Sequence, residues 1–150
     1  MSLNTLKSIT PGELADLKTA IEKAERRTSG EIRVFMEDHS EDGPLDRAAF
    51  LFEKLGMHKT ELHNGVLIYV ALQDRKFSII GDHGIHAKVG LSFWDQIKEK
   101  MTEQFKAGNI FDGLIAAVHD SGEALAAHFP YTSGDRDELS NDVLFGNTEP

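Results

Sequence analysis

The feature that most constrains the fold is an uninterrupted apolar run, Gly65-Val-Leu-Ile-Tyr-Val-Ala-Leu72. It has the length of a strand, and a strand that is apolar at every position is typical of one covered on both faces. The run is far short of the ~18–20 apolar residues that cross a bilayer. It therefore predicts the central strand of a layered α/β domain, with no membrane insertion.

The segments around this run predict how the sheet is connected. Residues 31–37 alternate apolar and polar side chains, as a strand does, and residues 45–55 carry apolar residues at helical spacing. A strand, a helix and a strand in this order imply a right-handed parallel crossover. After a polar turn at 73–76, residues 77–80 predict a third strand, antiparallel to the second. We expect a Rossmann-like three-layer α/β/α sandwich with a small mixed sheet.

Cap residues predict the remaining helices. Thr10-Pro-Gly-Glu13 has the pattern of a capping box, and Ser29-Gly30 is expected to end that helix. Ser92 is the expected cap of another helix that closes at Gly108, and a last helix is expected from about Asp112 to Pro130. Residues 1–130 are then one domain. Residues 131–150 form an acidic tail, expected either to be disordered or to lie across the domain.

Composition excludes several classes of function. The 150 residues carry 25 acidic and 16 basic side chains, a formal charge of −9, which disfavours nucleic acid and anionic lipid as partners. The chain has no cysteine, so disulfides, cysteine-ligated zinc and thiol nucleophiles are excluded. The start of the chain lacks the pattern of a signal peptide, which predicts a soluble, cytoplasmic protein.

The predicted topology brings distant polar residues together. Parallel first and second strands place Glu31 and Asn64 at one end of the sheet, and the returning third strand brings Asp82 to the same end. Carboxylate and amide oxygens suit hard cations, Ca²⁺ or alternatively Mg²⁺. Asp112 is either a further ligand or a helix cap. Each acidic residue alone would more often be a cap or a solvated loop residue.

Histidines give an alternative. His83 and His86 form a His-x-x-His pattern beside Asp82, which predicts zinc if the two rings face one another. The polar segment His58–Asn64 is expected to border the same pocket. The sequence contains neither a Gly-x-Ser-x-Gly nucleophile motif nor a glycine-rich phosphate loop.

Four segments in order resemble the TPM domain, the thylakoid acid phosphatase-like family: TSGEIRV, NGVLIYVA, RKFSIIGDHGI and FKAGNIFDGL. The similarity spans roughly residues 10–130. It implies a Rossmann-like sandwich, binding of divalent metal, calcium especially, and the acid phosphatase activity and photosystem repair associated with some plant members. By matching position it assigns the functional residues to Glu31, Asn64, Asp82 and Asp112. The sequence departs from the family where Gly-Asp-His-Gly replaces the usual Gly-x-Gly turn, and it lacks the common leader and anchor.

Three hypotheses follow. The first is a metal-binding domain that serves in the assembly or protection of another protein. The second is a metal-assisted acid phosphatase for phosphomonoesters, with Glu31 or Asp82 as base. No clear nucleophile is visible, and Arg75 and Lys76 are expected at the opposite end of the hairpin, where they provide no phosphate clamp. The third is an interaction module whose acidic residues are simply solvated.

Overall fold

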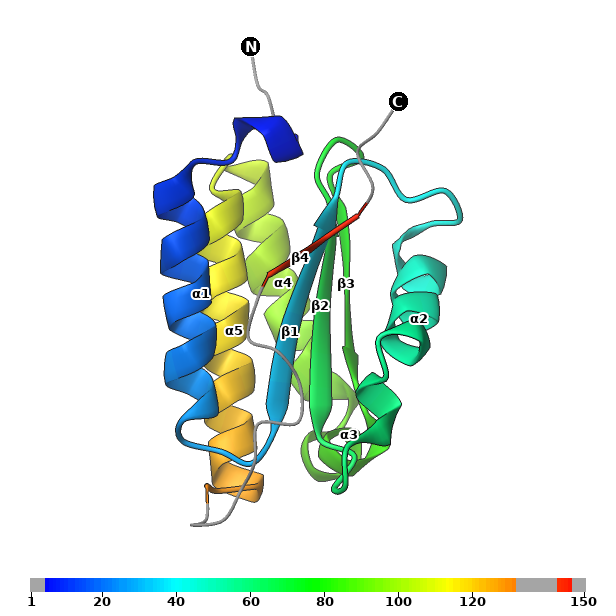
Figure 1. The fold of residues 1–150 in the computed structure, drawn as a ribbon, viewed down its shortest axis with the longest axis vertical. Coiled ribbons are helices and arrows are strands. Elements are labelled where there is room, and N and C mark those ends of the chain that lie inside the picture. Colours follow the sequence, from blue (N-terminus) through cyan, green and yellow to red (C-terminus); the bar gives the residue numbers. More distant parts are fainter. Residues whose placement is uncertain (1–4, 132–142, 147–150) are drawn as a thin grey trace.

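The computed structural model describes residues 5–131 and 143–146. They form a three-layer α/β sandwich around a four-stranded mixed sheet in the order β3-β2-β1-β4, and this confirms the predicted fold class. Figure 1 shows α1, α4 and α5 on one side of the sheet and α2 on the other. The elements are η1 (Leu6–Ser8), α1 (Pro11–Glu25), β1 (Glu31–Glu37), α2 (Pro44–Lys54), η2 (Met57–Lys59), β2 (Gly65–Ala71), β3 (Lys76–Gly81), α3 (His83–Val89), α4 (Leu91–Lys106), α5 (Ile110–His128) and β4 (Leu144–Phe145).

The sheet has the predicted connections. β1 and β2 are parallel, with Glu31 beside Gly65, and β2 and β3 are antiparallel, with Val66 beside Gly81. Every residue of β2 is buried, as its apolar sequence predicts. Because successive side chains of a strand point to opposite faces, the sheet supplies two cores.

The larger core lies under α1, α4 and α5, and the smaller one lies under α2. Strand residues in the larger core are Ile32, Val34, Met36, Val66, Ile68, Val70 and Ile79. Those in the smaller core are Phe35, Leu67, Tyr69 and Ala71. The alternation in β1 and the continuous run in β2 therefore determine which side chains each helix layer covers.

The first helix begins where its cap predicts. The Thr10 side chain accepts from the Glu13 N–H at 3.1 Å, and the Glu13 carboxylate accepts from the Thr10 N–H at 2.9 Å. This reciprocal pair satisfies two backbone donors that have no partner inside the helix. The α-helix ends at Glu25, and the following turn leads into β1.

The third strand ends at Gly81, as expected, and a short helix that was not expected follows it. This helix, α3, begins at His83 with Asp82 as its N-cap. A Cβ on residue 84 would lie 2.3 Å from the backbone oxygen of Leu62, so the glycine permits close packing of α3 on that segment. The expectation that Ser92 caps the next helix is wrong. Gly90, at φ 78°, ends α3 and precedes α4, which begins at Leu91.

Part of the acidic segment 131–150 is placed. Leu144 and Phe145 pair parallel to β1, and the Gly146 N–H donates to the Met36 oxygen at 2.7 Å. This four-residue piece thus lies against the domain; residues 132–142 and 147–150 lie outside the described residues. Across the part of the chain that the structure describes, no helix is long and apolar enough to span a bilayer.

Candidate metal centre

The start of β1, the start of β2 and the end of β3 lie at one end of the sheet. The Glu31 N–H donates to the Asn64 oxygen at 3.4 Å, and the Asp82 N–H donates to the Gly65 oxygen at 2.9 Å. Backbone pairing therefore brings Glu31, Asn64 and Asp82 to the same end, as the predicted topology requires.

Glu31 and Asp82 nevertheless lie on opposite sides of β2. Neighbouring strands are ~4.8 Å apart, so β1 and β3 are separated by about 10 Å. The space above the intervening Gly65 is occupied by Met57, whose backbone oxygen would lie 3.3 Å from a Cβ at that position. Glu31 is itself buried. The backbones of the two residues therefore share an end of the sheet, with β2 between them and Met57 over Gly65.

Asn64 is the buried residue at the centre of this end. Its side-chain amide donates to the Ser29 hydroxyl at 3.4 Å, and its backbone oxygen accepts from Glu31. The side-chain oxygen is buried and has no hydrogen-bond partner in the described parts of the chain. Such an oxygen has no protein donor among the described residues, so it retains acceptor capacity.

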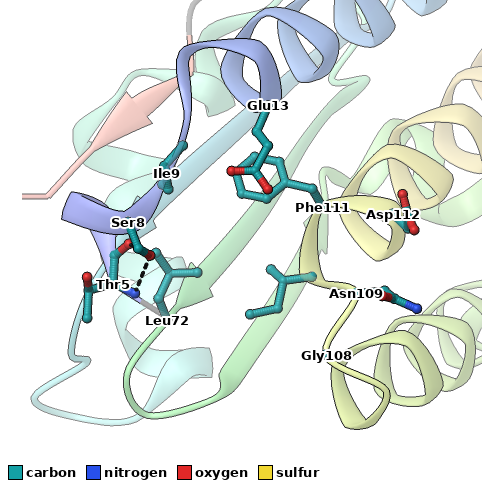
Figure 2. Close-up of a pocket in the computed structure, with 10 residues that line it drawn as sticks. Thr5, Ser8, Ile9, Glu13, Leu72, Gly108, Asn109, Phe111 and Asp112 are labelled. Carbon is teal, nitrogen blue, oxygen red and sulfur yellow. Dashed lines mark hydrogen bonds between the residues drawn. The ribbon is translucent and has the colours of Figure 1, made fainter. Parts of the chain in front are cut away.

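Asp112 lies at the other end of the sheet. It stands in the first turn of α5, where Asn109 is the N-cap. Together with Leu72, which follows β2, it lines a pocket of about 400 Å³ whose other residues include Glu13 and Phe111 (Figure 2). Because α5 begins beside the end of β2 and not beside its start, Asp112 does not join the other three predicted residues.

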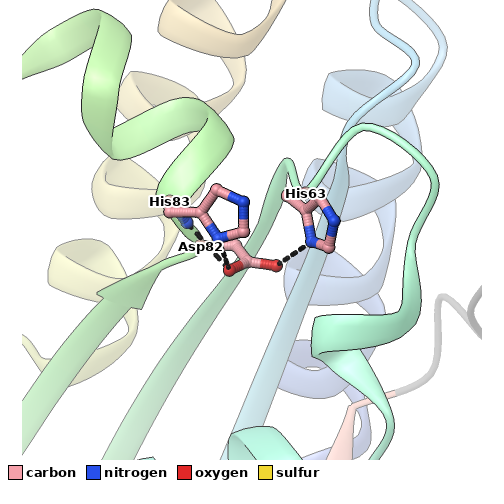
Figure 3. Close-up of side chains that lie close together, drawn as sticks. All are labelled: His63, Asp82 and His83. Atoms are coloured by element: carbon pink, nitrogen blue, oxygen red, sulfur yellow. Dashed lines mark hydrogen bonds and ion pairs between the residues drawn. The ribbon is translucent and has the colours of Figure 1, made fainter.

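The structure gathers a different set, His63, Asp82 and His83, which we call the His63–Asp82–His83 cluster (Figure 3). One ligand atom from each residue lies within 4.8 Å of the other two. His63 Nδ1 is 3.4 Å from Asp82 Oδ2, and His83 Nδ1 is 3.3 Å from Asp82 Oδ1. The two imidazole rings stack with their centroids 4.2 Å apart. The carboxylate thus lies between two ring nitrogens.

Local backbone structure places these side chains. Asp82 extends from β3 and caps α3 by accepting from the His83 N–H at 2.8 Å, which fixes one carboxylate oxygen. His63 has φ 51°, in the left-handed region that non-glycine residues seldom adopt. Gly84 allows the first turn of α3 to contact the backbone of Leu62 and His63. Close packing between the first turn of α3 and the loop before β2 therefore holds the cluster together.

The cluster has unused bonding capacity. Asp82 Oδ2 and His63 Nδ1 are both buried, and neither makes a hydrogen bond within the described residues. In a tetrahedral site with bonds of 2.0–2.1 Å, ligand atoms lie about 3.3–3.4 Å apart. Each ring nitrogen lies at this spacing from one carboxylate oxygen, His63 from Oδ2 and His83 from Oδ1, and one ligand atom from each residue lies within 4.8 Å of the others. The arrangement is suited to hold a small divalent cation through two imidazoles and one carboxylate.

The sequence pattern named the wrong second histidine. His86 points away from Asp82, because its Nδ1 accepts from the Trp94 indole N–H at 3.0 Å. One helical turn separates His83 from His86, and only the first lies at the helix start beside the carboxylate. His63 takes its place from the loop before β2. The only sequence signal for it was its position in the polar approach to the central strand.

A second polar network lies at the other end of the sheet, and its members bind one another. Arg47 donates to both oxygens of Glu37, at 2.8 and 3.1 Å, and the hydroxyl of the buried Tyr69 also donates to Glu37. The hydrogen bond to Glu37 raises the pKa of Arg47. Burial, followed by the bond to Glu37, raises the pKa of Tyr69 above its ordinary range. These groups are already satisfied by one another.

The fold and the cluster define a three-layer α/β domain with a candidate metal centre at one end of its sheet. The chain belongs to the TPM domain family, whose family model matches residues 5–124. The chain is similar to the BA42 protein of the psychrophilic bacterium Bizionia argentinensis, an NMR structure that is 43% identical, with a TM-score of 0.88 over 96% of this chain and 100% of that one.

Two more distant NMR structures share the fold. The N-terminal domain of cg2496 from Corynebacterium glutamicum is 14% identical, with a TM-score of 0.65 over 89% of this chain and 83% of that one. An N-terminal domain from P. gingivalis is 20% identical, with a TM-score of 0.67 over 81% and 78%. No curated protein matches the chain.

Proposed function

We propose that this protein is a divalent-metal-binding domain and that His63, Asp82 and His83 hold the ion. The observation that carries the proposal is the pair His63 Nδ1 and Asp82 Oδ2, both buried, 3.4 Å apart and without a hydrogen bond. Buried polar atoms that make no hydrogen bond are costly, and a cation between these two would satisfy both. The side-chain exposure of 76% at His83 gives an ion a route to the cluster.

The donor set bears on the choice of ion. Calcium and magnesium take oxygen ligands, which the proposed set of Glu31, Asn64 and Asp82 would supply. Two imidazoles and one carboxylate instead suit zinc, with its fourth position left for water or another ligand. We therefore propose Zn²⁺ at the His63–Asp82–His83 cluster. Ca²⁺ or Mg²⁺ would be the ions of the alternative oxygen set, whose two carboxylates come from strands on opposite sides of β2.

We also propose that binding, and not catalysis, is the primary role, in an accessory protein that assembles with or protects another protein. The cluster consists of two imidazoles and a carboxylate, with no serine, threonine or lysine among its three members. A three-ligand centre of this kind is sufficient for binding an ion and presenting it to a partner.

Calorimetry on chelator-treated protein tests the proposal, with Ca²⁺, Mg²⁺ and Zn²⁺ titrated separately. We expect binding to be lost in His63→Ala, His83→Ala and Asp82→Asn, and retained in His119→Ala and Asp74→Asn, which remove the same kinds of group elsewhere. Binding that needs Asp82 but neither histidine would favour the oxygen set. No heat with any of the three ions would contradict metal binding altogether.

Metal-assisted hydrolysis of phosphomonoesters is the second candidate, because the family model carries the name TPM phosphatase. An ion at the cluster would polarise a phosphoryl oxygen or activate a water molecule. The test is turnover of an aryl phosphate at acid pH in the metal-loaded protein. A steep loss in Asp82→Asn, with unchanged turnover in Asp74→Asn, would favour a phosphatase. Turnover indifferent to Asp82 would argue against one.

A further inference from the structure

The edge of the sheet at β3 is open. In the described sheet β3 is a terminal strand that pairs only with β2, and its six residues, Lys76-Phe-Ser-Ile-Ile-Gly81, follow a regular register without a bulge. The strand contains no proline and one charge. Open edges usually carry a bulge, a proline or several charges, because these features keep the unpaired backbone groups from pairing with another strand.

The direction of its free backbone groups follows from one hydrogen bond. The Asp82 N–H points to β2, where it donates to Gly65. Because these groups alternate along an antiparallel strand, Lys76, Ser78 and Ile80 also point inward, and Phe77, Ile79 and Gly81 point outward. Outward backbone groups of these three residues have no hydrogen-bond partner in the described segments. They can pair with a further antiparallel strand.

Charge complementarity favours a second copy of this chain as the partner of β3 and determines how the two strands are aligned. Two-fold symmetric pairing of β3 with a second copy requires outward residues to face outward residues, which leaves two registers with nearly full overlap. One places Ile79 opposite itself and Lys76 opposite Asp82 of the second copy, at both ends of the pair. The other places Ser78 opposite itself and Asp74 opposite Asp82, which sets like charges together. The first register is therefore favoured.

We propose that two copies of this chain pair through β3 to form one continuous sheet, with Ile79 at the two-fold axis. Three residue pairs, Phe77 with Gly81, Ile79 with Ile79 and Gly81 with Phe77, would each exchange two backbone hydrogen bonds. The faces also match. Phe77 and Ile79 belong to the larger core and Ile80 to the smaller one, so each core would continue into the same core of the second copy.

The pairing also changes the surroundings of the candidate metal centre. Arg75 and Lys76 lie at the start of β3, at the opposite end from Asp82 within one copy. Antiparallel pairing brings the second copy's Lys76 opposite Asp82 and its Arg75 opposite His83. The dimer therefore places two positive side chains beside a cluster that has none of its own. The favoured register depends on the negative charge of Asp82, so the pairing applies to the protein without an ion at the cluster.

Engineered cysteines test the register, because the natural chain contains none. Residues that face each other in a hydrogen-bonded pair have Cα atoms ~5.5 Å apart, within the range a disulfide spans. We expect Ile79→Cys to form a covalent dimer on oxidation and Ser78→Cys to remain monomeric. The reverse result would overturn the proposed register. The absence of crosslinking in both variants, each shown to be folded by circular dichroism, would overturn the dimer.

Sedimentation equilibrium of the unmodified chain, treated with chelator to keep the cluster free of metal, gives a second test that no folding defect can obscure. We expect a monomer–dimer equilibrium at low ionic strength that weakens with salt, because two symmetric ion pairs contribute to it. Lys76→Glu should raise the dissociation constant about tenfold, because it turns both pairs into repulsions, whereas Lys23→Glu on α1 should leave it unchanged. A monomer at every concentration, or equal effects of the two substitutions, would contradict the proposal.

Discussion

Asp82 Oδ2 lies 3.4 Å from His63 Nδ1, and within the described residues neither buried atom has a hydrogen-bond partner. The two residues are nineteen positions apart, yet the packing of α3 against the loop before β2 fixes their separation. The backbone of His63, which positions this side chain, is in the left-handed region, at φ 51°. The candidate site thus combines unsatisfied polar atoms with a conformation that most residues avoid, a combination typical of functional positions.

The backbone of His63 leads to the first prediction. His63→Gly and His63→Ala both remove the imidazole, so both should lose metal-dependent stabilisation. They should differ in stability without metal, because glycine adopts positive φ freely and alanine does not. We expect the glycine variant to be more stable than the alanine variant by about 1 kcal/mol in urea denaturation. Equal stabilities would show that the loop relaxes to another backbone conformation.

Gly84 gives the second prediction. A Cβ at this position would lie 2.3 Å from the Leu62 oxygen and 2.4 Å from the His63 oxygen, and backbone atoms cannot yield as a flexible side chain can. Gly84→Ala should therefore displace α3 and lower the free energy of unfolding by about 1–3 kcal/mol. It should also weaken metal binding, because Asp82 and His63 move apart. Gly12→Ala is the matched control, since a Cβ there would meet its nearest atom at 3.9 Å.

Much of the fold is predictable from the sequence, because its signals are local or one-dimensional. The apolar run of β2, the alternation of β1 and the capping box of α1 each act within a few residues, and the parallel crossover follows from element order. The pairing of β4 with β1 is different. Only two residues, Leu144 and Phe145, form it, at more than one hundred positions from their partners. A strand of only two residues produces no periodic pattern in the sequence.

The candidate site was only partly predictable for a related reason. Strand direction is enough to bring Glu31, Asn64 and Asp82 to one end of the sheet. It does not say that β2 keeps Glu31 and Asp82 about 10 Å apart. The role of His63 depends on a single left-handed residue and on the close approach of Gly84, and neither leaves a pattern in the sequence. Asp112 was misplaced because the end of the sheet at which α5 begins is a property of tertiary packing.

His39 and Asp74 give a third prediction, on pH. His39 Nδ1 lies 2.8 Å from Asp74 Oδ1, and this bond raises the pKa of His39. The same bond, followed by the Ser40 N–H, lowers the pKa of Asp74. A raised histidine pKa contributes stability that is lost as pH rises through it, and a lowered carboxyl pKa contributes stability that is lost as pH falls through it.

The contribution of this pair should therefore be greatest between about pH 4 and pH 6.5, the ordinary pKa values of the two groups. It should be small, because both side chains are near the surface. Asp74→Asn should reduce the melting temperature most within this window and least above pH 8. The measurement is thermal unfolding across pH, compared with Asp95→Asn, which removes an exposed aspartate on α4. A difference between Asp74→Asn and the natural chain that is constant with pH would contradict the assignment.

The fourth prediction concerns Tyr69, which is fully buried and donates its hydroxyl to Glu37. Tyr69→Phe keeps the ring and removes the hydroxyl, while Glu37 retains both bonds from Arg47. Hydrogen bonds to charged groups contribute about 1.5–3 kcal/mol, so the variant should be less stable by that amount at pH 7.

Because burial and Glu37 raise the pKa of Tyr69, the natural chain must lose stability as alkaline pH approaches this raised pKa. The advantage over Tyr69→Phe should then shrink above pH 10. Urea denaturation at pH 7 and at pH 10.5 measures both effects, and an advantage that grows with pH would show that the phenol is not protonated in the folded state.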